Sequence, residues 1–487
     1  MDTKRTMTRT AARRWMSTVL AAFLLAAPLS AQDNGGGGDD GDDGAGGGGT
    51  GSFFEDDSGG ESSPSTSVGG EVELELRAFP EYDDFDAFAD SEVTAVPRVK
   101  TEFTYEGSSS KVVADLEYSS RMPVDSFEEL IDEAYIRLFY DNLDVQAGYL
   151  KTTWGTGDEV HVVDVLNPTD FTDSINSEYA ERKIAEKMVK LNIYTGANGL
   201  LEIAYVPTLT QDRYATEGRW TPYEVQRLEA QLEELAALGP PTFDDEQAAA
   251  LAAKAESAPD PVTLADGQYG LRYTTSVGGV DIGGIYYFGF IREPVIEIPE
   301  AEPADYSIHF DRLNLFGLEF ATVVGGFNLR AEAAYNMTED FDGDDPSIHN
   351  HSIAYMGGFD RDLPVSNLNV NIQGRGEYLL ANDEVSDNAD NGLADVDYDA
   401  GENEHYWTNT LVASLEDTYR NETITPSVDF LFTAETQDYV VRPGVEFVLA
   451  DDATVNVRGS IFEGDRDTEF GQFDDNDHLE VRFEYAF

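Results

Sequence analysis

The sequence has no cysteine and few basic residues, and these two absences exclude several classes of protein. Without cysteine there is no disulfide, no thiolate metal site and no cysteine nucleophile. Lysine and arginine number 31 against 95 aspartate and glutamate, which gives a formal net charge of −64. Because a protein that binds nucleic acid needs positive charge to neutralise phosphates, we expect no nucleic-acid partner.

Long apolar runs are also lacking, apart from one run near the N-terminus. This run, Trp15 to Leu29, follows a basic start, contains Pro28 and ends at Leu29-Ser30-Ala31. It is shorter than the ~20 residues that span a bilayer. The pattern predicts a cleaved signal peptide over residues 1–31, with a membrane-anchoring helix as the alternative. If the mature chain crosses a membrane, it must therefore cross as a closed β-barrel.

Residues 32–70 consist mainly of glycine, acidic residues and serine. Such a segment buries too little apolar surface to offset the entropy lost on ordering. It predicts a flexible tether, either without a specific partner or in contact with periplasmic material.

From residue 71 to 487 the chain alternates between apolar and polar residues. Val99, Thr101, Phe103 and Tyr105 form one such series. This period places one face of a strand in lipid and the other in water. Besides 71–79, 99–105 and 112–118, the predicted strands lie at 135–140, 145–149, 188–194, 201–206, 269–275, 280–288, 313–320, 327–335, 350–358, 367–380, 406–416, 423–433, 438–449, 453–463 and 478–487.

The connections between these strands alternate between short and long. Gly107–Ser110 and Asp141-Asn142 are short, whereas 152–185 and 208–267 are long; 434–437 is the one exception to the order. Outer-membrane barrels have short periplasmic turns and longer external loops. The sequence therefore predicts an all-β fold, a transmembrane antiparallel up-and-down barrel of about 16–18 strands with both termini in the periplasm. A water-soluble sandwich also alternates, but this chain is too long for one sandwich.

The final ten residues alternate strictly and end in an aromatic side chain. Phe483, Tyr485 and Phe487 lie on the apolar face of this predicted strand. Here the sequence resembles the outer-membrane proteins of Gram-negative bacteria, whose last strand ends in an aromatic residue read by the barrel-assembly machinery. The resemblance implies this machinery and outer-membrane lipid as partners.

A second resemblance covers residues 148–182. Trp154-Gly155 with Asp158 forms a W-G-x-x-D element, and Asp164 to Asp170 reads D-V-L-N-P-T-D. The segment is similar to a strand-loop element of porin-like barrels of largely unassigned function. The resemblance supports the class and implies no particular solute.

The same segment carries charges of both signs, with acids first and bases later. Asn167 can cap a short helix that starts at Pro168, which brings Asp170 near exposed backbone amides. If the loop 152–185 folds inward, it sets acids against bases and creates a transverse field in a pore. The alternative is a solvated loop whose acids cap turns. The candidate constriction residues are Trp154, Asp158, Asp164, Asn167, Asp170, Arg182, Lys183 and Lys187.

The long loop 208–267 contains two helical patterns. Apolar residues recur at spacings of three and four from Val225 to Leu238, and a second pattern follows Glu246. We expect a helical hairpin that either covers the mouth of the barrel, binds a partner or packs on itself.

Acidic runs at 340–345 and 387–399 leave loop-bound calcium open, although neither has the order of an EF-hand. A solvated acidic surface is the simpler interpretation, and no cofactor is predicted. His349 and His351 are the best candidates for an enzyme site, but no P-loop, GxSxG or HExxH motif accompanies them. We therefore expect no enzyme.

These observations together predict an outer-membrane channel for passive diffusion of small hydrophilic solutes or ions, with a preference for cations. A non-conducting barrel that acts as a receptor or adhesin is one alternative. A plugged transporter of an apolar molecule is another, although the predicted inward positions Glu480, Arg482 and Glu484 are polar. The sequence leaves a homo-oligomer open.

Overall fold

The computed structural model describes residues 64–80, 92–121, 126–173, 179–236, 266–297, 307–390, 395–397 and 406–487. The predicted signal peptide and nearly all of the predicted tether lie outside these residues, as does the second helical pattern of the loop 208–267.

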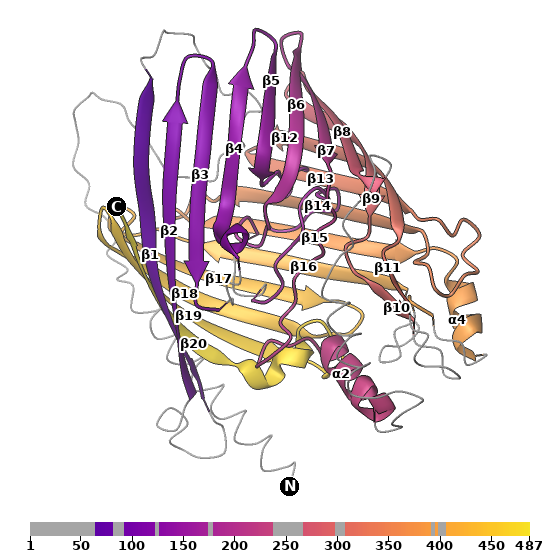
Figure 1. Ribbon diagram of the computed structural model, residues 1–487. Helices are drawn as coiled ribbons and strands as arrows, with labels where there is room; N and C mark the ends of the chain where they lie inside the picture. The colour runs from indigo at the N-terminus through magenta and orange to yellow at the C-terminus, as the bar shows by residue number, and fades with distance from the viewer. Residues whose placement is uncertain are drawn as a thin grey trace. The chain divides into compact units, whose positions relative to one another are not determined.

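Eighteen antiparallel strands form one sheet that closes on itself (Figure 1). Each strand pairs with its neighbour in the chain, and β9 pairs with β12 across the small β10–β11 sheet in the connection. The strands of the barrel are β1 Ser65–Phe79, β2 Glu92–Glu106, β3 Ser110–Ser119, β4 Ile131–Phe139, β5 Leu143–Leu150, β6 Glu186–Thr195, β7 Gly199–Val206, β8 Gln268–Val277, β9 Val280–Phe290, β12 Arg312–Val324, β13 Phe327–Met337, β14 Ser352–Asp362, β15 Asn369–Leu379, β16 Trp407–Glu416, β17 Ile424–Thr433, β18 Tyr439–Ala450, β19 Ala453–Glu463 and β20 His478–Ala486. The predicted barrel class is confirmed, at the upper end of the expected strand number.

The barrel closes between its first and last strands. The Gly70 amide donates to the Phe487 carbonyl at 3.1 Å, and the Phe487 amide donates to the Gly70 carbonyl at 2.9 Å. Nearly the whole barrel belongs to one compact unit, Ser62–Arg77 with Thr94–Phe487. A second unit, Met1–Glu61 with Ala78–Val93, contains few described residues beyond the adjoining ends of β1 and β2.

The connections contain the short strands β10 Val295–Glu297 and β11 Ser307–His309 and a few helices. The helices are η1 Phe127–Leu130, α2 Tyr223–Ala236, α4 Asn382–Asp390 and η4 Gly471–Asn476. Within the part of the chain that the structure describes, no helix is long and apolar enough to cross a membrane. The first helix predicted for the loop 208–267 is confirmed by α2. Helix α4 was not predicted, and it contains the acids of 387–390 that the sequence places in a loop.

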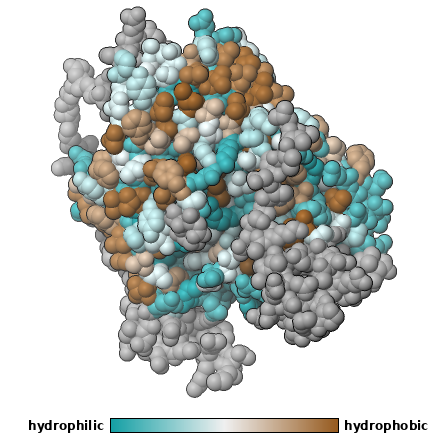
Figure 2. Space-filling view, in the orientation of Figure 1, coloured by the Kyte–Doolittle hydropathy of each residue, from teal (hydrophilic) through white to brown (hydrophobic). Residues whose placement is uncertain are grey.

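The two faces of each strand differ in polarity, as the alternation predicts. In β1, Leu74 and Leu76 are about 40% exposed, whereas Glu75 and Arg77 between them are at most 3% exposed. The apolar side chains point out of the barrel and the charged ones point into it. Apolar residues accordingly gather on the outer surface of the strands (Figure 2). The outer face thus suits lipid, and the charged face lines the interior.

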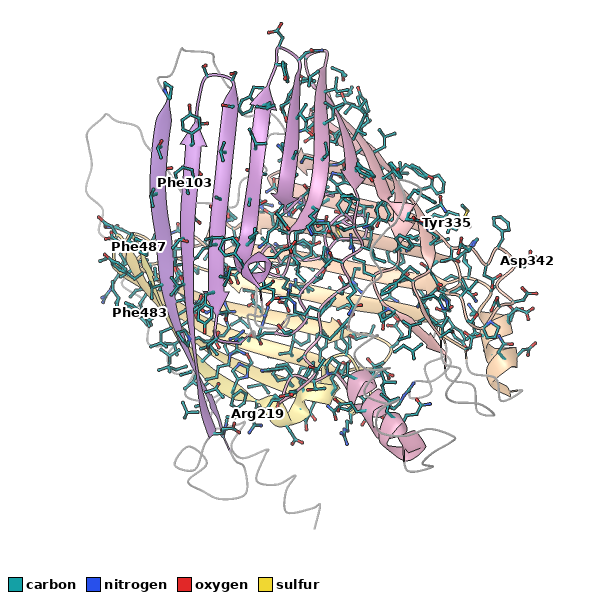
Figure 3. The ribbon with its side chains drawn as sticks, in the orientation of Figure 1. Phe103, Arg219, Tyr335, Asp342, Phe483 and Phe487 are labelled. Carbon is teal, nitrogen blue, oxygen red and sulfur yellow. The ribbon has the colours of Figure 1, made fainter. Side chains whose placement is uncertain are left out.

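Gly70 permits the closure, and its replacement provides a test. A Cβ atom at this position would lie 2.4 Å from the Lys100 carbonyl oxygen and 2.7 Å from the Phe487 ring; Figure 3 labels Phe487 near the seam. We expect Gly70→Val to prevent refolding into a heat-modifiable barrel, because the backbone atoms cannot withdraw. Gly357→Val is the matched control, since a Cβ there meets nothing within 4 Å. Equal refolding yields for both variants would contradict this role of Gly70.

Candidate constriction inside the barrel

The described residues of the segment between β5 and β6, 151–173 and 179–185, fold into the barrel. Trp154, Val163 and Leu166 have no exposed surface and pack in one cluster with Ile285 of β9 and Leu315 of β12. These wall positions alternate with outward residues such as the exposed Phe316, so the cluster lies on the inner face. The wall is apolar where the segment covers it. Water does not reach these positions, so polar side chains there would be buried without a partner.

Two glycines of the wall make room for this segment. A Cβ at Gly270 would lie 2.5 Å from the Trp154 ring, and one at Gly317 would lie 2.9 Å from the Val163 side chain. Contact at this distance requires glycine, so the wall is fitted to the inward position of the segment.

Glu332 of β13 holds the first part of the segment. One carboxylate oxygen accepts from the amides of Thr156 at 2.6 Å and Gly157 at 2.9 Å and contacts His161 Nδ1 at 3.0 Å. The other oxygen accepts from the Val162 amide at 2.8 Å. A single buried side chain thus satisfies the polar groups of a whole turn, which would otherwise be costly to bury.

The next contacts reach further round the wall. Gln373 Oε1 of β15 accepts from the Asp158 amide at 3.2 Å, and the Asp158 carboxylate pairs with Arg330 of β13. It also accepts from Asn371 at 3.2 Å. Asp158 therefore faces the interior and is tied to the wall. Burial raises the pKa of this carboxyl despite the opposing charge of Arg330.

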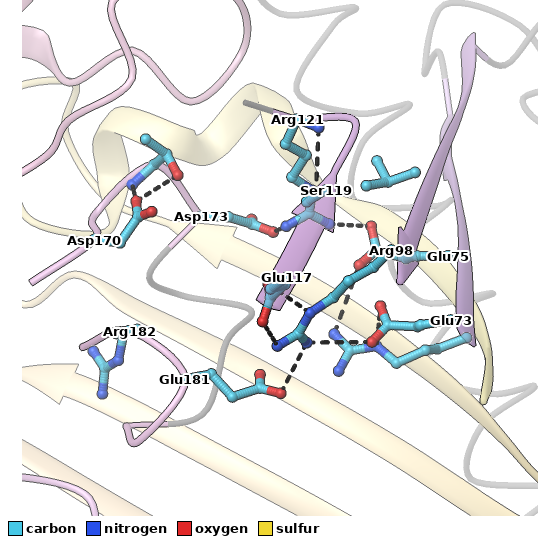
Figure 4. A pocket seen from close by; sticks show the side chains of 13 residues that line it. Glu73, Glu75, Arg98, Glu117, Ser119, Arg121, Asp170, Asp173, Glu181 and Arg182 are labelled. Atoms are coloured by element: carbon cyan, nitrogen blue, oxygen red, sulfur yellow. Dashed lines mark hydrogen bonds and ion pairs between the residues drawn. The ribbon is translucent and has the colours of Figure 1, made fainter. Parts of the chain in front are cut away.

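The second part of the segment reaches the strands of the closure. Asp173 accepts from Arg77 of β1 at 2.7 and 2.8 Å. Glu181 accepts from Arg98 of β2 at 3.1 Å (Figure 4). Arg77 also donates to Glu480 of β20 at 2.7 Å. A polar cavity of about 90 Å³ is lined by Arg98, Asp173 and Glu181, among other residues. Because its two parts contact β13–β15 and β1–β20, the segment 151–185 crosses the interior of the barrel.

Several predicted constriction residues stabilise the segment itself. Asp164 accepts from the Trp154 amide at 3.0 Å and pairs with Lys183, both almost fully buried. Asn167 accepts from the Thr152 amide at 2.8 Å and donates to the carbonyl groups of Leu150 and Ile184. It thereby joins the two ends of the segment. The short helix predicted to start at Pro168 is not formed.

The remaining predicted residues have different surroundings. Asp170 pairs with Arg213 at 3.0 Å, and Arg182 lies over the Tyr179 ring. Lys187 is about half exposed and pairs with Glu128 at 2.6 Å. Lys187 alternates with the buried Glu186 and Met188, so it lies on the outer face of β6 and does not face the interior.

Sequence analysis missed the wall residues that hold the segment, above all Glu332, Gln373 and Arg77. The alternation of polar and apolar residues along each strand identifies which side chains face the interior, but it does not identify the residue that each of them contacts. One signal was available: inward positions such as Ala204, Leu315 and Ala334 break the polar pattern of that face. Such a break indicates wall that is covered from inside.

The loop 208–267 contacts the connection between β19 and β20. Trp220 packs against Phe462 and Phe473, with ring centroids 5.9 and 5.3 Å apart. The Tyr223 amide, at the start of α2, donates to Gln472 of η4 at 2.8 Å. Since Phe462 is buried on the inner face of β19, the described part of the loop packs against the interior of the barrel at this end of β19.

The predicted histidine pair has no shared site. His349 donates to Asp311 at 2.7 Å, whereas His351 contacts the Tyr335 hydroxyl at 2.8 Å. In the described ranges, no group of three or more histidine or acidic residues is arranged to hold a metal ion. The acidic run 340–345 instead forms turns, in which Asp340 accepts from the amides of Gly343 and Asp345.

Two titratable groups in these connections, Asp397 and His349, have raised pKa values. Burial raises the pKa of Asp397 to about 6, although its oxygen accepts from the Asn350 amide at 2.7 Å. Burial disfavours the charged form of His349, but the hydrogen bond to Asp311 and the charge of Asp397 outweigh this and raise its pKa. His309, Asp395 and Glu293 are the other titratable groups around this pair.

Both groups bind their protons more tightly in the folded state, so both weaken the local contacts as the pH rises. For Asp397 the loss occurs between its ordinary value and about 6, and for His349 it follows above 6.5. We expect the amides of residues 345–351 to exchange hydrogen faster at pH 8 than at pH 5, after correction for intrinsic rates. Asp397→Asn should remove the lower part of this change. Equal protection at both pH values would contradict the expectation.

Comparison with known proteins reveals similarity in structure only. No family model matches the sequence, and no curated protein matches it. The BenF-like porin from Pseudomonas fluorescens Pf-5 is 7% identical, over 87% of this chain and 98% of that one, with a TM-score of 0.46. Pseudomonas aeruginosa OccK11 (OpdR) is 9% identical, over 87% and 96%, with a TM-score of 0.44. For the outer membrane channel DcaP of Acinetobacter baumannii the values are 10%, 87%, 98% and 0.40.

Proposed function

We propose that this protein is an outer-membrane channel for passive diffusion of small hydrophilic solutes or ions. The observation that carries the proposal is a closed 18-stranded barrel with an apolar outer face, a charged inner face and one segment across its interior. Barrels of 16–18 strands leave an aqueous path unless they are plugged. A charged segment that crosses such a path is suited to sort solutes by size and charge.

The proposal includes the location and the partners. The start of β1 and the end of β20 lie at the end of the barrel with the short turns, which corresponds to the periplasm in outer-membrane barrels. The exposed Phe483, Tyr485 and Phe487 fit the aromatic signal of the barrel-assembly machinery. The proposal leaves room for a homo-oligomer whose copies contact one another through their apolar outer faces in the membrane. Crosslinking in vesicles would test this.

The cation preference predicted from the net charge remains a prediction. Many acids of the inner wall are paired with arginine, for example Glu202 and Glu319 with Arg272 at 2.9 Å. Paired charges contribute little net field, so the selectivity depends on the charges that remain unpaired along the path.

Conductance of the refolded protein in a planar bilayer tests the channel. We expect stable open steps in KCl, and a reversal potential under a KCl gradient that gives the ion preference. A heat-modifiable barrel without open steps would contradict the proposal. It would favour the second candidate, a plugged barrel, for which the packing of Trp220 against Phe462 at the mouth is the supporting observation.

A further inference from the structure

A groove lies on the outer face of the barrel, across four neighbouring strands. It has a volume of about 480 Å³ and is lined by residues of β8, β9, β12 and β13. Its large apolar members are Tyr273, Ile282, Leu318 and Phe320, each between 38 and 66% exposed. Ligand sites in proteins have volumes of about 300–1,000 Å³ and mainly apolar walls. The groove therefore has the size and the polarity of a site for an apolar ligand.

Small residues form the floor of this groove. Gly284 lies between Tyr273 and Leu318 in the register of the sheet, and a Cβ atom there would meet nothing within 4 Å. Ala333 follows in the same row, on the other side of Leu318. A hydrocarbon chain that lies over small residues and beside large ones gains van der Waals contacts on more than one side.

The groove is bounded on the side of the long connections and continues toward the short turns. Tyr286 and Phe316 close the first side with a ring pair whose centroids are 5.2 Å apart, one row beyond Gly284. In the other direction, the outer face of β13 leads through Leu329 to Phe327, beside the turn at Gly325-Gly326. A chain in the groove is therefore directed toward the short turns.

An arginine lies on the outer face at this end. Arg361 of β14 alternates with the buried, inward Asp360 and so points outward. Its guanidinium carbon lies 4.4 Å from the centroid of the Phe327 ring, and it forms no ion pair or hydrogen bond with the described residues. Because Arg361 is four residues beyond Gly357, the partner of Ala331 in the groove, its charge lies ~13 Å further along the strands.

The charge of Arg361 complements the phosphate of a membrane lipid. The chain has 95 acidic residues for 31 basic ones, yet none of the described acids pairs with this outward arginine. Guanidinium groups bind phosphate oxygens through paired hydrogen bonds. A basic side chain at the membrane surface also attracts anionic lipids. An apolar groove that leads to such a cation matches the two parts of a phospholipid.

We propose that the groove and Arg361 bind one anionic phospholipid, whose acyl chain lies over Gly284 and Ala333 and whose phosphate contacts Arg361. The proposal rests on the proposed position in the outer membrane, with the short turns toward the periplasm, but it does not require conduction. It places the lipid in the leaflet that faces the periplasm.

Native mass spectrometry of the refolded full chain in detergent, with added dioleoylphosphatidylglycerol, tests the site. Gly284→Leu fills the groove, and Arg361→Gln removes the charge. We expect the parent to keep one lipid per barrel and Gly284→Leu to lose it. Arg361→Gln should need about five-fold more lipid for half occupancy, since one basic residue is lost at the membrane surface.

Two control variants carry the same substitutions outside the site. Gly374→Leu adds the same side chain to the outer face of β15, where a Cβ meets only the Thr410 carbonyl oxygen, at 3.8 Å. Arg420→Gln removes an arginine from the short turn between β16 and β17. Both controls should bind the lipid as the parent does. Dioleoylglycerol, which has the chains without the phosphate, should bind the parent and Arg361→Gln equally.

Equal occupancy by dioleoylphosphatidylglycerol in the parent and in both test variants would overturn the proposal. A dimer of the parent that Gly284→Leu abolishes while bound lipid is unchanged would also overturn it, because the groove would then be the contact with a second copy. Heat-modifiable migration confirms that each barrel has folded. A barrel that binds the lipid but conducts no ions would contradict only the channel, and a conducting barrel without the lipid would contradict only the lipid site.

Discussion

Arg77→Ala is expected to destabilise the barrel by roughly 3–5 kcal/mol, because it removes the most buried cation of a network in which only Arg121 and Arg482 then remain to balance the buried carboxylates. Arg77 is 3% exposed, and it binds Glu75, Asp173 and Glu480. It therefore joins the first strand, the last strand and the crossing segment. Urea unfolding of the protein in lipid vesicles, followed by tryptophan fluorescence, measures the change.

Arg137→Ala is the control for this prediction. Arg137 also pairs with a buried acid, Asp144 at 2.8 Å, but its own side chain is 27% exposed and lies away from the seam. We expect a loss of about 1 kcal/mol for this variant, since Asn192 and Tyr194 still donate to the Asp144 carboxylate. If both variants lose the same stability, Arg77 has no special role in the closure.

Glu332→Ala is expected to release the first part of the crossing segment and to raise the single-channel conductance. The carboxylate accepts from three backbone amides and contacts His161, and no other described side chain replaces it. Buried amides without acceptors cost about 1–3 kcal/mol each, so the segment should leave its place on the wall. Conductance and open-channel noise in a planar bilayer, recorded with the parent, measure the effect.

Glu319→Ala separates this effect from a general loss of wall charge. Glu319 is as buried as Glu332 and binds Arg272 at 2.9 Å, but it makes no hydrogen bond to the crossing segment. We expect lower stability with unchanged conductance. A rise in conductance for Glu319→Ala equal to that for Glu332→Ala would mean that the segment is not held by Glu332.

The alternation of the sequence was sufficient to predict the barrel. A strand between lipid and water repeats every two residues, so both the existence and the limits of strands are visible locally. The predicted strand 453–463 coincides with β19, and 423–433 differs from β17 by one residue. At the N-terminus the prediction was less complete, since β1 begins at Ser65, six residues before the predicted start. Its first residues, Ser-Thr-Ser, resemble the serine-rich segment before them.

The constriction was predicted only in part. The sequence offered the segment 152–185 as a constriction on the condition that it folds inward, and a solvated loop was the alternative. Its candidates included Lys187, whose side chain lies on the outer face of β6, and Asp158, whose amide donates to Gln373 of the inner wall. It also treated Asp164 and Lys183 as groups that face each other across a pore. In the structure they form one buried pair within the segment. Spacing along a loop does not reveal which wall residue its side chains meet.

The sequence by itself determined the strands, their inner and outer faces and the order in which neighbours pair, because each depends on residues close in the chain. Only the tertiary structure decided what fills the interior. Glu332 meets residues about 170 positions away, and Arg77 meets Glu480 at a separation of 403. Such pairs leave no local pattern, since any inward acid and any inward base look alike until closure of the barrel brings particular ones together.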